Sequence, residues 1–148
     1  MRRVFKLLLF VLAVLFVAIQ FVRPPRTNPA ADPADPLTAH VPAHVAVILD
    51  RSCRDCHSSQ TRWPWYSNIA PASWLVIEHV DHGREHFNYS NWPTYDEQRK
   101  LSIRRSSCDM ARAGTMPMPS YLLLHPSARM SEGDIAALCE WAVPLAAH

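Results

Sequence analysis

The five residues Cys53-Arg54-Asp55-Cys56-His57 constrain this chain more than any other stretch. They read C-x-x-C-H, the pattern of c-type haem attachment. Haem carries two vinyl groups, and two thiols separated by two residues can each add to one of them. The histidine after the second thiol then lies beneath the ring and can bind the iron through a ring nitrogen. The motif predicts one covalent haem c, held by Cys53 and Cys56, with His57 as an axial ligand.

Other proteins also use two closely spaced cysteines. A C-x-x-C pair occurs in thiol–disulfide enzymes and in zinc sites, and it can also close a small disulfide loop with an incidental histidine. A thioredoxin-like enzyme would surround the motif with alternating strands and helices, and no run of alternating β-branched residues is present there. A zinc site would need Cys108 and Cys139, which lack the close spacing of a zinc knuckle. We therefore rank these alternatives below haem.

The charge of the chain argues against nucleic-acid binding. Of the 15 basic residues, five lie in residues 1–26, where there is no acidic residue. The remaining residues therefore hold 10 basic and 13 acidic side chains, which makes this part slightly acidic. A nucleic-acid binder would need a basic face. With only 3 glycines in 148 residues, a glycine-rich phosphate loop is also excluded.

Residues 1–23 predict a signal anchor or transmembrane helix. Three basic residues within the first six precede an uninterrupted apolar run, Leu7 to Ile19. A spanning helix needs about 20 mostly apolar residues, and residues 4–22 just reach this length. No small-x-small cleavage site follows, so we favour a retained single-pass anchor in the bacterial inner membrane, with the domain facing the periplasm. The alternative is a cleaved signal that releases the protein into the periplasm.

The next segment, residues 24–40, predicts a linker rich in proline and alanine. Five prolines fall between residues 24 and 36, and proline both fixes the backbone and removes a hydrogen-bond donor. We expect an extended tether. Residues 41–148 are then long enough for one small domain.

Helical periodicity indicates that this domain is all-α, with long irregular loops. Apolar spacing predicts a helix over about 42–51 that leads to Cys53. Ser73 resembles the N-cap of a helix that ends near residue 86. Thr94 or Asp96 can cap another helix over about 96–113, with Gly114 as its stop. Residues 131–134 resemble a capping box that opens a last helix.

Aromatic residues after the motif predict one wall of the haem pocket. The alternative is an ordinary core under an irregular loop. The pocket candidates are Trp63, Trp65, Tyr66, Ile69, Pro71, Trp74 and Tyr121.

Histidines on the predicted helix over 73–86 are a further candidate group. His79, His82 and His86 recur at i, i+3 and i+7. They could bind a second metal, and one of them could be the distal haem ligand. We interpret the group first as a solvated face.

The stretch Thr115-Met116-Pro117-Met118-Pro119 predicts the second axial ligand. A methionine beside proline on a constrained loop suits a thioether that must point at iron, because proline limits the freedom of the loop. Either methionine could instead fill a gap in a core. After a C-x-x-C-H motif we expect Met116 to bind the iron, with Met118 as the alternative.

Together these motifs resemble the bacterial haem-binding domain family, which is related to class I cytochromes c. The residues that carry the resemblance are C-x-x-C-H-S, Trp63-Pro64-Trp65-Tyr66-Ser67, Gly83-Arg84, Phe87-Asn88-Tyr89-Ser90, Gly114-x-Met116-Pro117, Tyr121, His125-Pro126 and Trp141. They span about residues 41–145. The resemblance implies a small, helical, cytochrome c-like domain that faces the periplasm, with iron bound by His57 and Met116.

Cys108 and Cys139 lie outside the haem motif, on two different predicted helices. In an oxidising compartment such a pair often forms a disulfide. Alternatively, both are small buried hydrophobic residues that never meet. Sequence does not decide between these two arrangements.

The function that we predict is single-haem electron transfer with an unidentified redox partner protein. A six-coordinate iron with histidine and methionine ligands suits electron transfer, so we expect a carrier and not a catalyst. The first alternative is a haem-based redox or gas sensor or a peroxidase-like enzyme, for which His79, His82, His86 or His125 could supply a distal group. A thiol–disulfide oxidoreductase ranks last.

Overall fold

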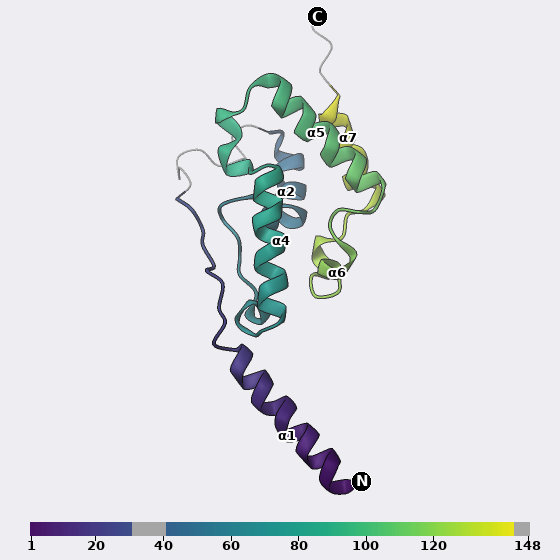
Figure 1. Cartoon of the computed structure of the whole chain (residues 1–148). Coiled ribbons are helices and arrows are strands. Elements are labelled where there is room, and N and C mark those ends of the chain that lie inside the picture. Colours follow the sequence, from purple (N-terminus) through teal and green to yellow (C-terminus); the bar gives the residue numbers. More distant parts are fainter. Residues whose placement is uncertain (31–40, 144–148) are drawn as a thin grey trace, which may run out of the picture.

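The computed structural model describes residues 1–30 and 41–143. Over these ranges the chain is helical without any strand, as predicted (Figure 1). The α-helices are α1 (Arg2–Ile19), α2 (Ala43–Ser52), α3 (Arg54–His57), α4 (Ala72–His86), α5 (Glu97–Arg112), α6 (Pro119–Leu122) and α7 (Glu132–Ala142). Three 3-10 turns separate them: η2 (Trp65–Asn68), η3 (Tyr89–Thr94) and η4 (Pro126–Ala128).

The predicted ends of α5 and α7 are formed by the expected residues. The Asp96 carboxylate accepts a hydrogen bond from the backbone N–H of Arg99 at 2.7 Å and caps α5. Gly114, with φ of 66°, follows the last turn, and this left-handed conformation favours glycine. At the start of α7, Ser131 and Asp134 form a reciprocal capping box.

The start of α4 differs slightly from our prediction. The helix begins at Ala72 with Pro71 as its N-cap residue, and no side chain caps it. Ser73 lies inside the first turn, where it is buried. Proline at the boundary sets this start, because its ring already fixes a helix-compatible φ.

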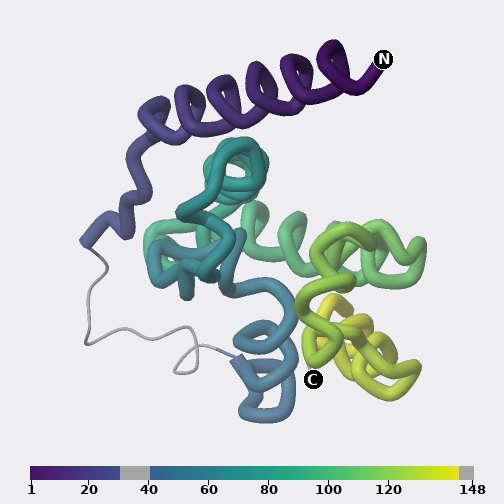
Figure 2. Tube along the Cα trace, turned by 90° about the horizontal axis from the view of Figure 1, so that it is seen from below, coloured from purple at the N-terminus to yellow at the C-terminus, as the bar shows by residue number. Residues whose placement is uncertain are grey.

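Helices α2, α5 and α7 pack around the main apolar core. Val45 and Leu49 from α2 are fully buried, and Leu138 from α7 and Ile103 from α5 meet them. Figure 2 shows α5 (green) and α7 (yellow) side by side. The loop over η3 adds Tyr89 to the same core. This core supports one wall of the site described below.

A disulfide joins α5 to α7. Cys108 and Cys139 are bonded, and their Cα atoms lie 4.8 Å apart. The structure therefore realises the paired alternative of the two that the sequence left open. Both residues are buried beside Ala142, at the end of the α5–α7 contact. The bond closes a loop of 31 residues in sequence separation.

The N-terminal segment forms a helix, but it does not support the predicted membrane-spanning anchor. Helix α1 has no buried residue. Nowhere in the described residues is a helix both long enough and apolar enough to cross a membrane. Three basic residues occupy the first turns of α1, which leaves only residues 7–19 as an uninterrupted apolar run. At 1.5 Å per residue this run is about 20 Å long, less than the bilayer core of about 30 Å.

Residues 20–28 are bonded to the domain, where composition predicted a free tether from residue 24. The Gln20 side chain donates to the carbonyl of Ala70 at 3.1 Å and accepts from the N–H of the same residue at 2.9 Å. The indole of Trp74 donates to the carbonyl of Val22 at 2.8 Å. Arg84 donates to the carbonyl of Thr27 at 2.8 Å. We call residues 20–28 the N-terminal strap. Of the rest of the predicted linker, residues 31–40 lie outside the described residues.

The disulfide generates a stability prediction. Replacing both Cys108 and Cys139 with serine should lower the free energy of unfolding by about 3–4 kcal/mol, the chain-entropy value for a loop of this length. Denaturant unfolding of the full chain measures this change. Dithiothreitol should destabilise the wild type by a similar amount and leave the double variant unchanged. Equal stability of the wild type with and without reductant would contradict the bond.

Candidate functional site

The C-x-x-C-H motif lies at the junction of α2, α3 and α4. Cys53 ends α2 and begins α3, and Cys56 and His57 form the last turn of α3. All three side chains line a cavity of about 460 Å³. This volume is within the range at which proteins bind small molecules and cofactors. Both thiols are free, so the cavity presents two thiols and one imidazole together.

Helix α4 approaches the motif more closely than most helices could, because residue 83 is glycine. A Cβ atom at Gly83 would lie 2.5 Å from the carbonyl oxygen of Cys56 and 3.2 Å from its Cβ. Real side chains do not occupy such distances, so only glycine permits this approach. The absence of a side chain lets α4 support the motif from behind.

The backbone that follows α4 orients His57. The His57 ring stacks on the Phe87 ring, with centroids 4.1 Å apart and planes 12° apart. His57 Nδ1 lies 3.4 Å from the Phe87 carbonyl oxygen, which can accept a hydrogen bond from the Nδ1–H group. A hydrogen bond at Nδ1 leaves the lone pair of Nε2 for a metal, the arrangement found behind most histidine ligands. Burial lowers the pKa of His57, which favours the neutral, metal-binding imidazole.

The two thiols lie in an environment that keeps them protonated. Burial raises the pKa of Cys53 to about 12, with a smaller contribution from Cys56. Burial and the neighbouring Asp55 carboxylate raise the pKa of Cys56 to about 11, and Arg84 opposes them. Thiol–disulfide enzymes need the opposite, because the attacking species is a thiolate with a lowered pKa. The environment therefore argues against a thiol–disulfide oxidoreductase.

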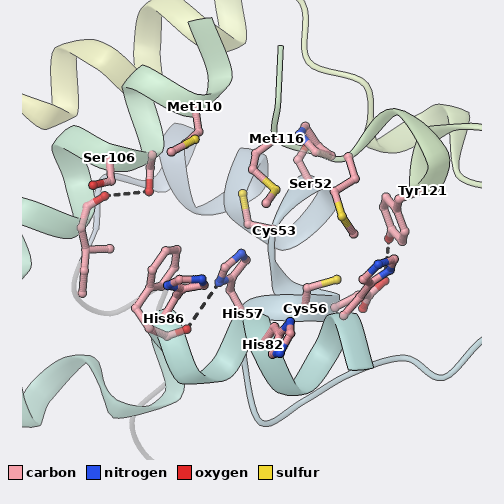
Figure 3. A pocket seen from close by; sticks show the side chains of 18 of the residues that line it. Ser52, Cys53, Cys56, His57, His82, His86, Ser106, Met110, Met116 and Tyr121 are labelled. Carbon is pink, nitrogen blue, oxygen red and sulfur yellow. Dashed lines mark hydrogen bonds between the residues drawn. The ribbon is translucent and has the colours of Figure 1, made fainter. Parts of the chain in front are cut away.

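The loop after α5 brings methionine sulfur to the cavity. Met116 and Met118 both line the cavity, together with Met110 and Met130. The loop is fixed to the end of α5, because the backbone N–H groups of Thr115 and Met116 donate to the Met110 carbonyl at 3.1 and 3.3 Å. Figure 3 shows the Met116 side chain directed toward Cys53 and His57. Whether Met116 or Met118 is the distal ligand stays a prediction.

Tyr121 also reaches the cavity and ties α6 to the haem motif. Its hydroxyl donates to Asp55 Oδ2 at 3.0 Å. Burial, followed by the charge of Asp55, raises the pKa of Tyr121, so the phenol stays protonated and remains a donor. Asp55 also accepts from the Arg62 backbone N–H at 3.2 Å and from Arg62 Nε at 3.1 Å. Asp55, which lies between the two cysteines of the motif, thus holds the segments of Tyr121 and Arg62 against it.

The remaining aromatic candidates do not line the cavity. Of the seven predicted pocket residues, only Tyr121 does so; Trp63, Trp65, Tyr66, Ile69, Pro71 and Trp74 lie elsewhere. Trp74 binds the N-terminal strap, as described above, and Trp65 is 72% exposed. The Tyr66 hydroxyl lies 3.4 Å from His125 Nδ1. The aromatic wall is instead supplied by Phe87, whose position after α4 carries no periodicity that could have predicted it.

The histidines of α4 lie at the cavity but do not form a metal cluster. His79, His82 and His86 all line it. Nevertheless, no group of three histidine, cysteine or acidic residues within 1–30 and 41–143 could hold a metal ion. The second metal site that we considered is therefore not supported. The zinc alternative also loses two ligands, because Cys108 and Cys139 are bonded to each other.

The cavity fits a c-type haem in its donor set and its walls. It holds two protonated thiols for the vinyl groups, one oriented imidazole and methionine thioethers. Phe87, Ile103 and Leu138 make its walls largely apolar. Ser52, a residue only 7% exposed, also lines the cavity.

The glycine contact generates a prediction for the site. Gly83→Ala should lower the free energy of unfolding by about 1–3 kcal/mol, because the added methyl group overpacks the α3–α4 contact. Gly133→Ala in α7 is the matched control. A Cβ there would lie 3.7 Å from Ser131 Oγ, an ordinary contact. Denaturant unfolding compares the two, and equal stabilities would show that α4 does not press on the motif.

Comparison with known proteins agrees with this geometry. The haem-binding domain family matches residues 14–143, nearly the whole chain. Searches of the curated proteins and of the solved structures find no match. The matched region begins inside α1 and includes the N-terminal strap together with the cavity. By its sequence and its site, the chain belongs to the haem-binding domain family.

Proposed function

We propose that this protein holds one covalent haem c in the cavity and carries single electrons in the periplasm. The observation that carries the proposal is the meeting of both motif thiols, the His57 imidazole and a methionine loop around one cavity. We further propose that the helical domain is cytochrome c-like. When bound, the haem supplies an iron that cycles between two oxidation states. Family membership supports haem binding. Covalent attachment and electron transfer are supported by the geometry of the cavity.

Covalent attachment is supported by the positions and protonation of the thiols. Cys53 and Cys56 line the cavity within one helical turn of each other, and His57 follows directly. Their raised pKa values keep them as thiols, the form that adds across a vinyl group, and disfavour premature oxidation. The α4 backbone behind Cys56 limits the movement of the motif.

Electron transfer is supported by the ligand arrangement. His57 is held by its stacking on Phe87 and by the carbonyl acceptor at Nδ1. Met116 is held by the attachment of its loop to the end of α5. Because the protein restrains His57 and the loop of Met116, little rearrangement would accompany a change of iron charge if these residues held the iron. Histidine and methionine ligation also raises the reduction potential relative to two histidines, which suits a carrier. The exchange partner would be another redox protein.

A location outside the cytoplasm is supported by two independent features. The first is the disulfide between Cys108 and Cys139, since such bonds persist in oxidising compartments. The second is the basic start followed by the 13 apolar residues Leu7 to Ile19, a length typical of an export signal. We propose that this segment directs the domain to the periplasm.

One observation favours an alternative function. Met116 follows residues 113–115, which are exposed and do not line the cavity, so the proposed distal ligand belongs to a loop at the protein surface. A ligand of this kind can dissociate and open a coordination position. The protein would then act as a redox or gas sensor or as a peroxidase-like enzyme. Carbon monoxide binding to the reduced wild type separates this alternative from the carrier.

Absorption spectra of three methionine variants test the proposal. The wild type, produced with a cytochrome c maturation system, should show low-spin haem with a sulfur-to-iron charge-transfer band in the oxidised form. Met116→Ala should lose that band, because its thioether is the distal ligand. Met118→Ala and the control Met110→Ala, which both line the same cavity, should keep it.

Three outcomes would change the account. Loss of the band only in Met118→Ala would transfer the ligand role to that residue. A wild type that is high-spin or binds carbon monoxide would favour the sensor or peroxidase-like alternative. A colourless protein from the maturation system would contradict haem attachment.

A further inference from the structure

A polar stripe on α5 faces the cavity on the side away from the motif thiols. Arg99, Ser102 and Ser106 line the cavity and recur at i, i+3 and i+7, which places them on one face of the helix. Met110 continues the same face toward the methionine loop. Figure 3 shows Ser106 and His86 on the opposite side of His57 from Cys56 and Tyr121. The cavity therefore has a thiol side and a hydroxyl-rich side.

Arg99 is held on the hydroxyl-rich side by α4. Its Nη2 donates to the backbone carbonyl of His86, in the last turn of that helix. A guanidinium has five N–H donors in a fixed fork, so this single bond leaves others available. Ser107, the next hydroxyl on α5, already donates to the Ile103 carbonyl at 2.8 Å. Ser107 is therefore already bonded, whereas Ser102 and Ser106 line the cavity on the same helix face as Arg99.

The two acidic residues at the start of α5 already have partners, and Asp55 lies on the thiol side of the cavity. Asp96 caps α5 through the backbone N–H of Arg99 at 2.7 Å, and Glu97 pairs with Lys100 at 2.9 Å. Asp55 lies on the thiol side, bonded to Tyr121 at 3.0 Å. A carboxylate ligand on the thiol side would meet this charge. On the α5 side it would meet a guanidinium and two hydroxyls.

Haem carries its two propionate carboxylates on the edge opposite its vinyl groups. Attachment of the vinyl groups to Cys53 and Cys56 therefore directs the propionates away from the thiol side. We propose that Arg99, assisted by Ser102 and Ser106, binds the haem propionates at the rim of the cavity. This inference rests on the proposed function. Arg99 is a positioning residue here, since it compensates the carboxylates and does not touch the iron.

The midpoint potential of the covalent haem protein tests the proposal. Arg99→Gln should lower the potential, because an uncompensated propionate stabilises the oxidised, more positive iron. Arg99→Lys should retain most of the wild-type value. Arg105→Gln is the matched control, because it removes the same charge from the same helix at an exposed residue that does not line the cavity. A potential in Arg99→Gln equal to that of Arg105→Gln would overturn the proposal.

A second measurement removes the carboxylates instead of the arginine. Wild-type apoprotein should bind haem about tenfold more tightly than haem dimethyl ester, the ratio expected for one charge-assisted hydrogen bond. Arg99→Gln should lose most of this preference, whereas Arg105→Gln should keep the wild-type preference. The Ser102→Ala/Ser106→Ala variant should lose a smaller part of the preference for haem over its ester. This variant tests the proposal if Arg99→Gln does not fold. Equal binding of haem and its ester by the wild type would overturn the proposal.

The two proposals fail in different ways. A wild type that acquires no haem in the maturation system overturns the proposed function, and the propionate site with it. A wild type that holds haem, with no effect of Arg99→Gln on potential or ester preference, overturns only the propionate site.

Discussion

The contact between α4 and the haem motif is the constraint on which the site depends. Gly83 lets the α4 backbone approach the carbonyl of Cys56 at a distance that any side chain would prevent. The same helix ends at His86, and the ring and carbonyl of the next residue, Phe87, orient His57. One helix therefore supports both Cys56, a proposed attachment point, and His57, the proposed proximal ligand. The histidine is held with its Nε2 lone pair free because the backbone behind it is fixed.

The other side of the cavity is built from more distant parts of the chain. Helix α5 supplies Ile103 and Met110, and the loop attached to its end supplies Met116. The disulfide holds α5 against α7, and Leu138 of α7 completes the wall. The packing of α5 against α7 thus helps to position Met116, the proposed distal ligand. A small domain gains much from such a covalent bond, because its core is limited.

Local patterns predicted the helices well. The spacing of Val45 and Leu49 gave α2, and the capping residues Asp96 and Ser131 gave the starts of α5 and α7. These signals act over three or four residues, so they are visible in a single sequence. The motif Cys53-Arg54-Asp55-Cys56-His57 is local in the same sense, and its three donors meet at one cavity.

Contacts between residues far apart in the chain were harder to predict from the sequence. Aromatic residues such as Trp65 and Trp74 lie close to the motif in sequence, but sequence proximity does not show which way a side chain in the irregular segment or at the start of α4 faces. They pack away from the cavity, and Trp74 binds the N-terminal strap. The strap combines the end of the predicted anchor with the start of the predicted linker, and only tertiary hydrogen bonds such as those of Gln20 reveal its attachment. The pairing of Cys108 with Cys139 likewise required geometry.

Covalent attachment is the central claim, and intact-mass spectrometry of the denatured protein tests it most directly. The full chain would be produced with a cytochrome c maturation system, unfolded in acid and weighed beside a Cys53→Ala/Cys56→Ala variant. We predict that the wild type retains the added mass of one haem after unfolding and that the variant does not. A wild type with the mass of the bare polypeptide would contradict covalent haem binding at this motif.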